Sequence, residues 1–258
     1  MAFSSSKATA LRQVVQVRVQ MSSIGSVGLV MRGFLGFLSS ARYLMTHRAM
    51  LEPMNLTSLD ALRALYATPG ERAVKKQLAS LDRHCRRFIE LSPFLVLATT
   101  GATGTMDASP RGGVPGFIKT PDESTLLIPD APGNNRLDSL ENILATGRVG
   151  LLFLVPGVDE TLRVNGSAVL SQAESDLALC ADERRVPKVV VKVSVQEAYL
   201  HCAKALMRSD LWNPAKHLDR SQLPSMGEML RDQMVGKLPD ETVFETQAQM
   251  LVRYQNTP

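Results

Sequence analysis

The sequence predicts a mainly β, α+β fold, in which an antiparallel sheet closes into a small barrel with helical attachments. About six or seven segments have the alternating or fully apolar pattern of strands, and short turns with Gly or Pro join most of them. Such turns join antiparallel neighbours, which argues against a doubly wound parallel sheet. Closing the sheet removes the exposed edges that it would otherwise present.

The composition is that of a globular protein. The chain has 258 residues, of which 45% are hydrophobic and 21% charged, and it is long enough to bury a sizeable core. Its three cysteines, Cys85, Cys180 and Cys202, are too few and too scattered for a disulfide framework. This cysteine usage favours a reducing compartment, and we expect a cytoplasmic protein.

The first 53 residues differ from the rest in charge. They hold six basic residues and one acid, so that the 29 bases and 25 acids of the whole chain leave 23 and 24 for residues 54–258. A nearly neutral body argues against a nucleic-acid partner. Arg32 interrupts the apolar run 24–38, which argues against a membrane span. We predict a basic N-terminal extension outside the fold over 1–53 and one domain over 54–258.

Two interpretations of the extension stay open. Its acid-poor, amphipathic composition is typical of an organellar transit peptide, which would place the protein in an organelle. The alternative is an upstream extension that takes no part in the fold, with Met50 or Met54 as the working start. Helix-like sequence of mixed charge begins abruptly at Ser58, which favours the second interpretation.

Two helices are predicted before the first strand. Leucines at three-residue spacing indicate a short helix over 58–66, with Ser58 as its cap. Residues 71–91 place apolar side chains along one helical face and predict one long helix, which Pro93 ends.

Alternation and turn residues define the elements that follow. The predicted strands are Phe94–Thr100, Thr105–Ser109, Thr125–Pro129, Val149–Val155, Thr161–Ser171 and Lys188–Val195, with a short extended segment at Phe117–Lys119. The predicted helices are Asn135–Thr146, Ala173–Cys180, Ala198–Met207 and Met226–Met234. Glycine and proline predict irregular structure over Pro110–Gly116, and we expect an irregular tail after the last helix.

The segment Asp107–Gly113, Asp-Ala-Ser-Pro-Arg-Gly-Gly, brings a hydroxyl, a guanidinium and glycine N–H groups together after a strand. The planar fork of Arg111 offers paired donors to a phosphate, and glycine lets an anion approach the backbone closely. The alternative is a tight turn with a surface arginine.

A second anion-binding pattern opens the helix predicted from Asn135. The N–H groups of a helix N-terminus attract anions, Asn134 or Asn135 can cap the helix, and Arg136 can reach the same anion. The alternative is an Asn-capped helix with a solvated arginine. Two arginine-bearing phosphate sites at one barrel mouth would make a pocket for a phosphorylated cofactor.

A third pattern lies on and after the helix predicted over 198–207. His201, Lys204 and Arg208 are spaced three and four residues apart, so that a helix would present them on one face. Trp212 follows one turn further on, and its ring and N–H donor suit a planar ligand or an interface.

Several enzyme classes have no signature in the sequence. No segment matches a Walker loop, a GxGxxG after a strand, HExxH or GxSxG. The pairs His84-Cys85 and His201-Cys202 lie too far apart for the short ligand spacings of a structural zinc site, and we expect no metal. Cys202 beside His201 is a poor nucleophile pair, because neighbours on a helix point apart.

Four segments together resemble the pyridoxamine 5′-phosphate oxidase-like family of FMN-binding proteins. They are Leu91–Thr99, Ser109–Gly113, Leu126–Asp130 and Pro132–Leu140. Further segments are similar to a bacterial subgroup of that family: Leu151–Gly157, Glu160–Gly166, His201–Lys204 with Arg208 and Trp212, and Pro224–Leu230. The resemblance covers residues 54–235 and does not reach residues 1–53.

The resemblance implies a split antiparallel β-barrel of the FMN-binding type that forms a homodimer, with the flavin at the interface. The FMN phosphate would be held by Arg111, with Lys119 nearby, and by the turn of Asn134, Asn135 and Arg136. The other residues implied on the cofactor side are Ser109, Gly112, Pro129 and Asp130.

The resemblance identifies no catalytic residue. The reactive arginine and histidine that the family uses on pyridoxamine phosphate have no clear match, and a substitute set on the substrate or flavin side is His201, Lys204, Arg208 and Trp212. We therefore expect an FMN-dependent oxidoreductase with a small-molecule substrate other than the one that names the family.

Three alternatives stay open. One is a flavin-binding or flavin-sensing protein without catalysis, and another is a deazaflavin-dependent reductase. The third is haem binding, which is known among split barrels. Its candidate ligands in 54–258 are His84, His201 and His217, and none of them lies in the pocket motifs.

Overall fold

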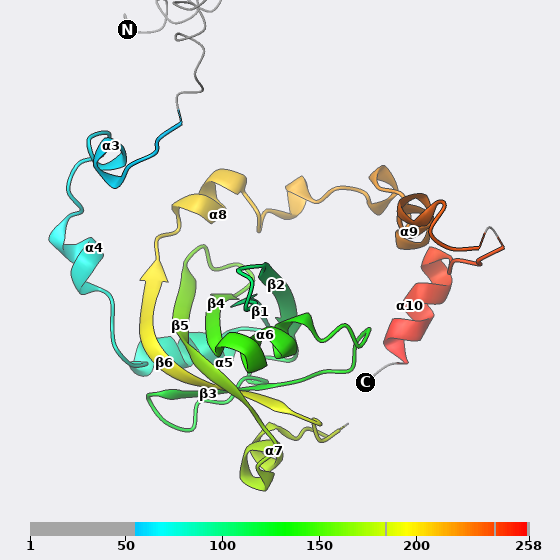
Figure 1. Cartoon of the computed structure of the whole chain (residues 1–258), viewed down its shortest axis with the longest axis horizontal. Coiled ribbons are helices and arrows are strands. Elements are labelled where there is room, and N and C mark those ends of the chain that lie inside the picture. Colours follow the sequence, from blue (N-terminus) through cyan, green and yellow to red (C-terminus); the bar gives the residue numbers. More distant parts are fainter. Residues whose placement is uncertain (1–54, 184, 240, 257–258) are drawn as a thin grey trace, which may run out of the picture. The chain divides into compact units, whose positions relative to one another are not determined.

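Figure 1 shows the computed structural model of the chain, which describes residues 55–183, 185–239 and 241–256. The chain divides into two compact units, Met1–Ala67 and Thr68–Pro258. In the first unit the described residues include α3 (Leu59–Arg63), and Ser58 caps this helix by accepting a hydrogen bond from a backbone N–H at 3.1 Å. The interpretations of residues 1–53 lie outside the described residues.

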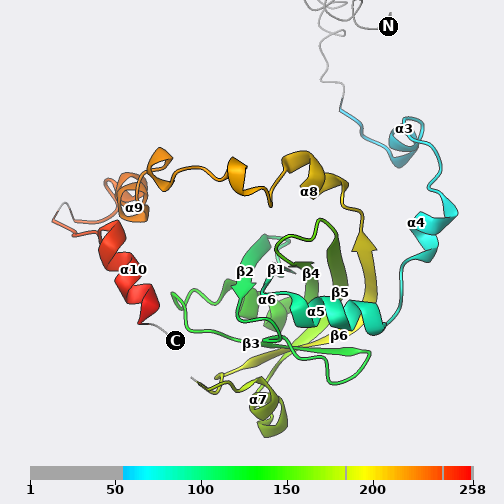
Figure 2. The same cartoon turned by 180° about the vertical axis from the view of Figure 1, so that it is seen from behind.

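The second unit is built on a six-stranded antiparallel sheet. Its strands are β1 (Phe94–Thr100), β2 (Met106–Gly112), β3 (Thr125–Pro129), β4 (Arg148–Leu154), β5 (Thr161–Ser171) and β6 (Val190–His201). Their order across the sheet is β2-β1-β4-β5-β6-β3, so that β2 and β3 are its edges, and the strands curl around a core (Figures 1 and 2). The predicted fold class, an antiparallel split barrel with helical attachments, is confirmed.

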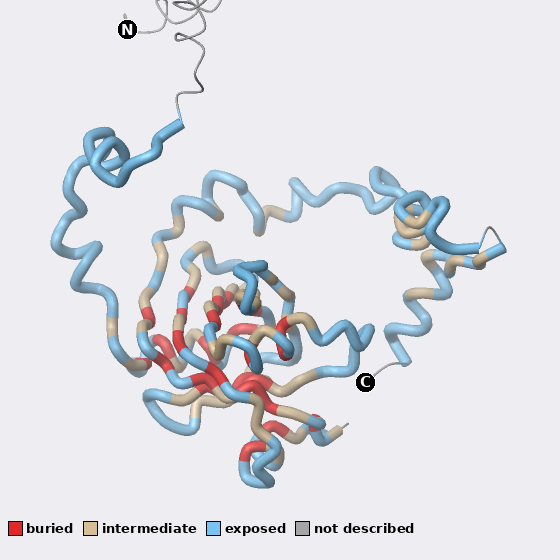
Figure 3. The backbone as a smooth tube through the Cα atoms, in the orientation of Figure 1, coloured by how far each residue is buried: buried red, intermediate tan, exposed pale blue. Residues whose placement is uncertain are grey.

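The core fills the inside of the curled sheet, where the buried residues gather in Figure 3. Alternate residues of each strand point inward, as Leu95 and Leu97 do on β1 and Leu151 and Phe153 on β4. Two helices cover this core: α5 (Arg83–Leu91) buries Ile89 and Cys85, and α6 (Asp138–Thr146) packs against β1 and β5.

The helix predicted over 71–91 is two helices. α4 (Glu71–Lys75) ends early, and α5 begins only at Arg83. Between them Leu78 forms an isolated antiparallel bridge with β6, in which its N–H and C=O pair with those of Ala198 at 2.9 Å. Backbone pairing with β6 thus replaces the helical hydrogen bonds that the apolar spacing predicted.

The prediction of a helix over 198–207 is wrong for the first half of that range. β6 continues to His201 because it stays paired with β5 as far as Thr161, and only α8 (Lys204–Ser209) is helical. β2 likewise runs on through Pro110, where the sequence predicted irregular structure. An edge strand tolerates a proline, since one side of it forms no ladder.

The remaining helices are α7 (Glu174–Cys180), α9 (Met226–Met234), α10 (Gln247–Gln255) and the short 3-10 turns Pro214–Lys216 and Arg220–Gln222. α10 falls in the tail that was predicted to be irregular, where Thr246 caps it with Gln249 in a capping box. Within the described ranges, no helix is both long enough and apolar enough to cross a bilayer.

Candidate functional site

The two edges of the sheet meet at Arg111 and Asp130. Arg111 lies on β2, and Asp130 directly follows β3. The Nη1 atom of Arg111 lies 3.3 Å from Oδ1 of Asp130, and each side chain is only about a fifth exposed, at 22% and 23%. A side-chain ion pair therefore joins the two edges.

Two adjoining cavities open at this junction, and Arg111 lines both. The larger cavity has a volume of about 1020 Å³, and the smaller cavity about 810 Å³. Six residues predicted on the cofactor side line the larger cavity: Ser109, Arg111, Asp130, Asn134, Asn135 and Arg136. The smaller cavity takes in Arg111 again with Gly112, Lys119 and Pro129. The structure thus gathers every residue of that predicted set around one junction.

One hydrogen-bond donor of Arg111, its Nε–H, has no partner among the described residues. It reaches Asp130 through Nη1, whereas its Nε–H is buried and no atom of the described residues accepts from it. Leaving such a donor unsatisfied costs about 1–3 kcal/mol. A buried arginine N–H at a cavity wall fits an anionic ligand group such as a phosphate, whose oxygens accept from guanidinium groups.

The turn of Asn134, Asn135 and Arg136 lies before α6 and not in its first turn. Asn135 and Leu137 have left-handed backbones, with φ of 59° and 62°, and the helix begins at Asp138 without a side-chain cap. Arg136 Nε donates to the Asp138 carboxylate at 2.8 Å. The expectation of an Asn-capped helix is therefore wrong, and the carboxylate of Asp138 is a partner of Arg136 within the chain.

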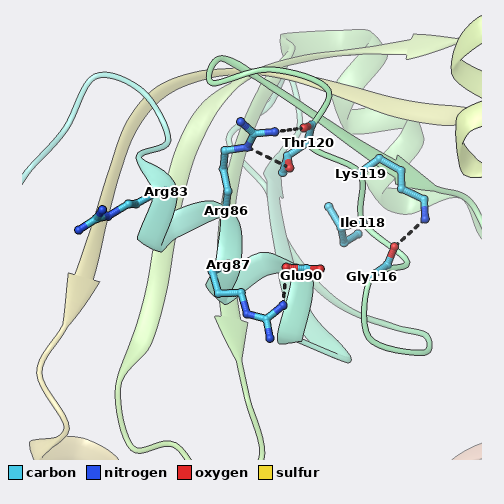
Figure 4. A pocket seen from close by; sticks show the side chains of 8 residues that line it. All are labelled: Arg83, Arg86, Arg87, Glu90, Gly116, Ile118, Lys119 and Thr120. Carbon is cyan, nitrogen blue, oxygen red and sulfur yellow. Dashed lines mark hydrogen bonds and ion pairs between the residues drawn. The ribbon is translucent and has the colours of Figure 1, made fainter.

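Lys119 lies between the smaller cavity and a third one of about 690 Å³, which Figure 4 shows between α5 and the loop before β3. Its Nζ donates to the Gly116 carbonyl at 2.8 Å. Arg86 donates to a backbone carbonyl of the loop at 3.0 Å, and Arg87 pairs with Glu90 at 2.6 Å. These cationic side chains diverge in Figure 4, so the third cavity does not gather them around one anion.

Arg185 reaches the junction from the loop before β6, and sequence reasoning missed it. Its Nη1 donates to the carbonyl oxygen of Asp130 at 3.3 Å, and it lines both cavities. In the sequence it ends a run of charged residues, 182–185, which has the pattern of a solvated loop. Only the fold brings it to Asp130, which lies 55 positions away along the chain.

The larger cavity is positively charged. Four cationic side chains line it against two carboxylates: Arg111, Arg136, Arg185 and Lys188 against Asp130 and Asp138. An excess of like charge around a concave surface attracts an anionic ligand.

A second polar cluster surrounds Asp107, which the sequence analysis did not select. Its carboxylate accepts hydrogen bonds from the hydroxyls of Ser109 at 3.0 Å, Ser139 at 2.6 Å and Thr99 at 3.4 Å. Ser139 and Thr99 are each only 2% exposed, and Asn142 donates to the Thr99 hydroxyl at 3.0 Å. Of these residues, Ser109 and Ser139 line the larger cavity.

The predicted substrate-side set does not share one helix. His201 ends β6, Lys204 and Arg208 lie on α8, and Trp212 follows that helix. The cavities lie near Val190, at the other end of β6, roughly 35 Å away along the strand. The residues that line the two cavities of one chain include none of this set.

Two members of that set have partners of their own. The ring of His201 lies 5.0 Å from the ring of Tyr199, and burial together with two nearby cations lowers the pKa of the imidazole. It is therefore neutral at neutral pH. Trp212 donates its indole N–H to the Val158 carbonyl at 3.0 Å.

Cys180 is the one thiol that lines the described cavities, and it lies in the wall of the smaller one. Burial raises the pKa of this thiol to about 11. The thiol stays protonated near neutral pH, and a thiolate nucleophile is not available there.

The domain is thus an antiparallel split barrel with cationic cavities where its sheet edges meet, and such cavities suit an anionic small molecule. Residues 81–202 match the family model described as pyridoxamine 5′-phosphate oxidase. This stretch, which holds all six strands and all the residues predicted on the cofactor side, is therefore similar to the pyridoxamine 5′-phosphate oxidase family.

The chain is similar to several solved structures. One is HupZ from Group A Streptococcus, at 17% identity over 46% of this chain and 93% of that one, with a TM-score of 0.39. Another is a protein from Lactobacillus delbrueckii named as a candidate pyridoxamine 5′-phosphate oxidase (21% identity, 48% and 98% covered, TM-score 0.37). A third is an FMN-binding protein from Syntrophomonas wolfei (11% identity, 56% and 97% covered, TM-score 0.35). No curated protein matches the chain.

Proposed function

We propose that the protein is an FMN-dependent oxidoreductase that acts on a small molecule as a homodimer. The observation that carries the proposal is the junction of the two sheet edges. There the buried, unpartnered Nε–H of Arg111 lines a positively charged cavity in a domain that is similar to the pyridoxamine 5′-phosphate oxidase family.

In this proposal the chain's own residues bind and orient the cofactor. Arg111 and Arg185 hold the phosphate beside Asp130, and the turn of residues 134–136 encloses it from the side of α6. Pro129 borders the smaller cavity at the end of β3 and limits how far a ring can enter. Bound FMN would supply hydride transfer at its N5 atom, while the protein supplies position and electrostatic environment.

A flavin-binding protein without turnover is the second candidate, and the lining of the cavities favours it. Among the described residues, no histidine lines either cavity, and the Cys180 thiol stays protonated. Histidine and thiolate groups are common acids, bases and nucleophiles in enzymes. An oxidoreductase built on these cavities therefore relies on carboxylates or on its partner protomer for proton transfer.

The first test is the visible absorbance spectrum of the purified protein, repeated on the supernatant after heat denaturation. We expect an oxidised-flavin spectrum that follows the released small molecule, or one acquired when FMN is added. A colourless protein that also fails to bind added FMN would overturn the proposal.

The second test compares Arg111→Gln with Arg148→Gln, a matched change at an exposed arginine at the start of β4. A charged hydrogen bond contributes about 1.5–3 kcal/mol, so Arg111→Gln should weaken FMN binding about tenfold or more. Arg148→Gln should leave it unchanged. An enzyme should turn over a reductant and an acceptor faster than free FMN does, whereas a binding protein should not. Light scattering measures the molar mass in solution and tests whether the protein is a homodimer.

A further inference from the structure

One face of β2 presents three polar side chains toward the larger cavity or just behind its wall. Asp107, Ser109 and Arg111 alternate with more exposed residues along the strand. Residues two apart on a strand lie about 7 Å apart, so that Asp107 and Arg111 are about 13 Å apart along the strand. The two ends of this row differ in charge and in hydrogen-bonding capacity.

At one end, Asp107 fixes the direction of two hydrogen bonds. An ionised carboxylate only accepts, so the hydroxyl protons of Ser109 and Ser139 point toward Asp107, at 3.0 Å and 2.6 Å. A hydroxyl has one proton, and both oxygens therefore have only lone pairs left for the cavity that they line. This end of the wall accepts hydrogen bonds and, beside a negative charge, disfavours an anion.

At the other end, two guanidinium groups meet around one residue. Arg111 pairs with the carboxylate of Asp130, and Arg185 donates to its carbonyl oxygen, both at 3.3 Å. Arg185 uses a neutral partner there, and Arg111 keeps its buried Nε–H. This end donates hydrogen bonds and favours an anion.

We infer that the larger cavity binds a flavin nucleotide in one orientation: its phosphate between Arg111 and Arg185, and hydrogen-bond donors of the ligand on Ser109. Asp107 is the positioning residue for this orientation, since it takes the hydroxyl protons of Ser109 and Ser139 without lining the cavity itself. The inference rests on the proposed function and adds to it the positioning role of Asp107 and the contact of the ligand with Ser109.

The ratio of the dissociation constants of riboflavin and FMN tests this orientation, because the two ligands differ only in the phosphate. Arg185→Gln should weaken FMN binding about tenfold or more and leave riboflavin binding unchanged, so that the ratio falls. Asp107→Asn frees the serine hydroxyls to donate and places an amide N–H on their lone pairs. It should weaken both ligands by roughly three- to tenfold and leave the ratio unchanged.

A double-mutant cycle separates positioning from a general effect on the fold. If Asp107 acts through the Ser109 hydroxyl, Asp107→Asn should weaken binding much less in the background of Ser109→Ala than in the native chain. A purely structural role predicts losses that add. Glu160→Gln, in the exposed turn between β4 and β5, is the matched carboxylate-to-amide control and should change neither constant.

Each outcome decides between the inference and the proposed function. A native protein that binds neither flavin refutes the proposed function itself. If the native protein binds FMN but the riboflavin-to-FMN ratio of dissociation constants rises in Asp107→Asn, the phosphate lies near Asp107. That result contradicts the inference and leaves the proposed function intact. Additive losses in the cycle, or an unchanged ratio in Arg185→Gln, contradict it as well.

Discussion

Replacing Arg111 by methionine should separate ligand binding from stability. In the protein without flavin, the buried Nε–H of Arg111 has no acceptor among the described residues, which costs about 1–3 kcal/mol. Its ion pair with Asp130 is partly exposed and long at 3.3 Å, so it contributes only about 0–1 kcal/mol. Methionine keeps the apolar stem and removes the unsatisfied donor. We therefore expect Arg111→Met to unfold with a free energy equal to the native one or up to about 3 kcal/mol higher.

The assay is equilibrium urea denaturation of both proteins after flavin is removed, with FMN titration of the same samples. FMN affinity should fall about tenfold or more while stability is kept or gained. Arg148→Met, at an exposed site on β4, serves as the control for losing one positive charge. A loss of more than about 2 kcal/mol in Arg111→Met without flavin would refute the reasoning, because Arg111 would then be a structural residue and not one held ready for a ligand.

Three further predictions concern the scaffold. Hydrogen bonds from Ser171 and Lys192 lower the pKa of Asp176, so its carboxylate contributes stability above about pH 4 that is lost as the pH falls through the lowered pKa. Asp176→Asn should therefore reduce the fall of the urea midpoint at acid pH, measured between about pH 2 and 7. A methyl group at Gly166 would collide with the Ser194 carbonyl at the β-bulge, so Gly166→Ala should lower the unfolding free energy by about 2 kcal/mol or more, whereas Gly70→Ala, in open space, should not. A thiol reagent at pH 8 should modify exposed Cys202 quickly and reach the buried Cys85 and Cys180, both with a pKa raised to about 11, only after denaturation.

The sequence predicts the elements correctly where local residues determine the strand or helix. β3, β5 and α9 have the predicted bounds, because their alternation, turns or caps are local. The break before α5 also has a local signal that we did not use: Asp82 accepts from the Cys85 N–H at 2.7 Å and caps the helix.

Elsewhere the secondary structure of a segment depends on contacts with residues far away in the sequence. Residues 198–201 have no strong period, and pairing with β5 keeps them in β6. The predicted cofactor residues lie in short motifs on β2, in the loop before β3, at the end of β3 and in the loop before α6, so local patterns together with the family resemblance could select them as candidates. Arg185 and Asp107 become candidates only through contacts with residues distant in the sequence. Arg185 contacts Asp130 and Asp107 contacts Ser139, and no local pattern indicates either residue.

The place of the candidate site follows from how this sheet closes. β1, β4, β5 and β6 each have a strand on both sides, so their backbone donors and acceptors are largely committed to the sheet. β2 and β3 each have one such neighbour, and within the described ranges β3 has on its other side only an isolated bridge, to Lys119. Arg111 and Asp130 close the gap through side chains, and side-chain donors can exchange one partner for another when a ligand arrives. A phosphate held there would touch residues from both edges at once. Binding should therefore tighten the closure of the barrel, and under the proposed function the residues that close the sheet would also hold the ligand.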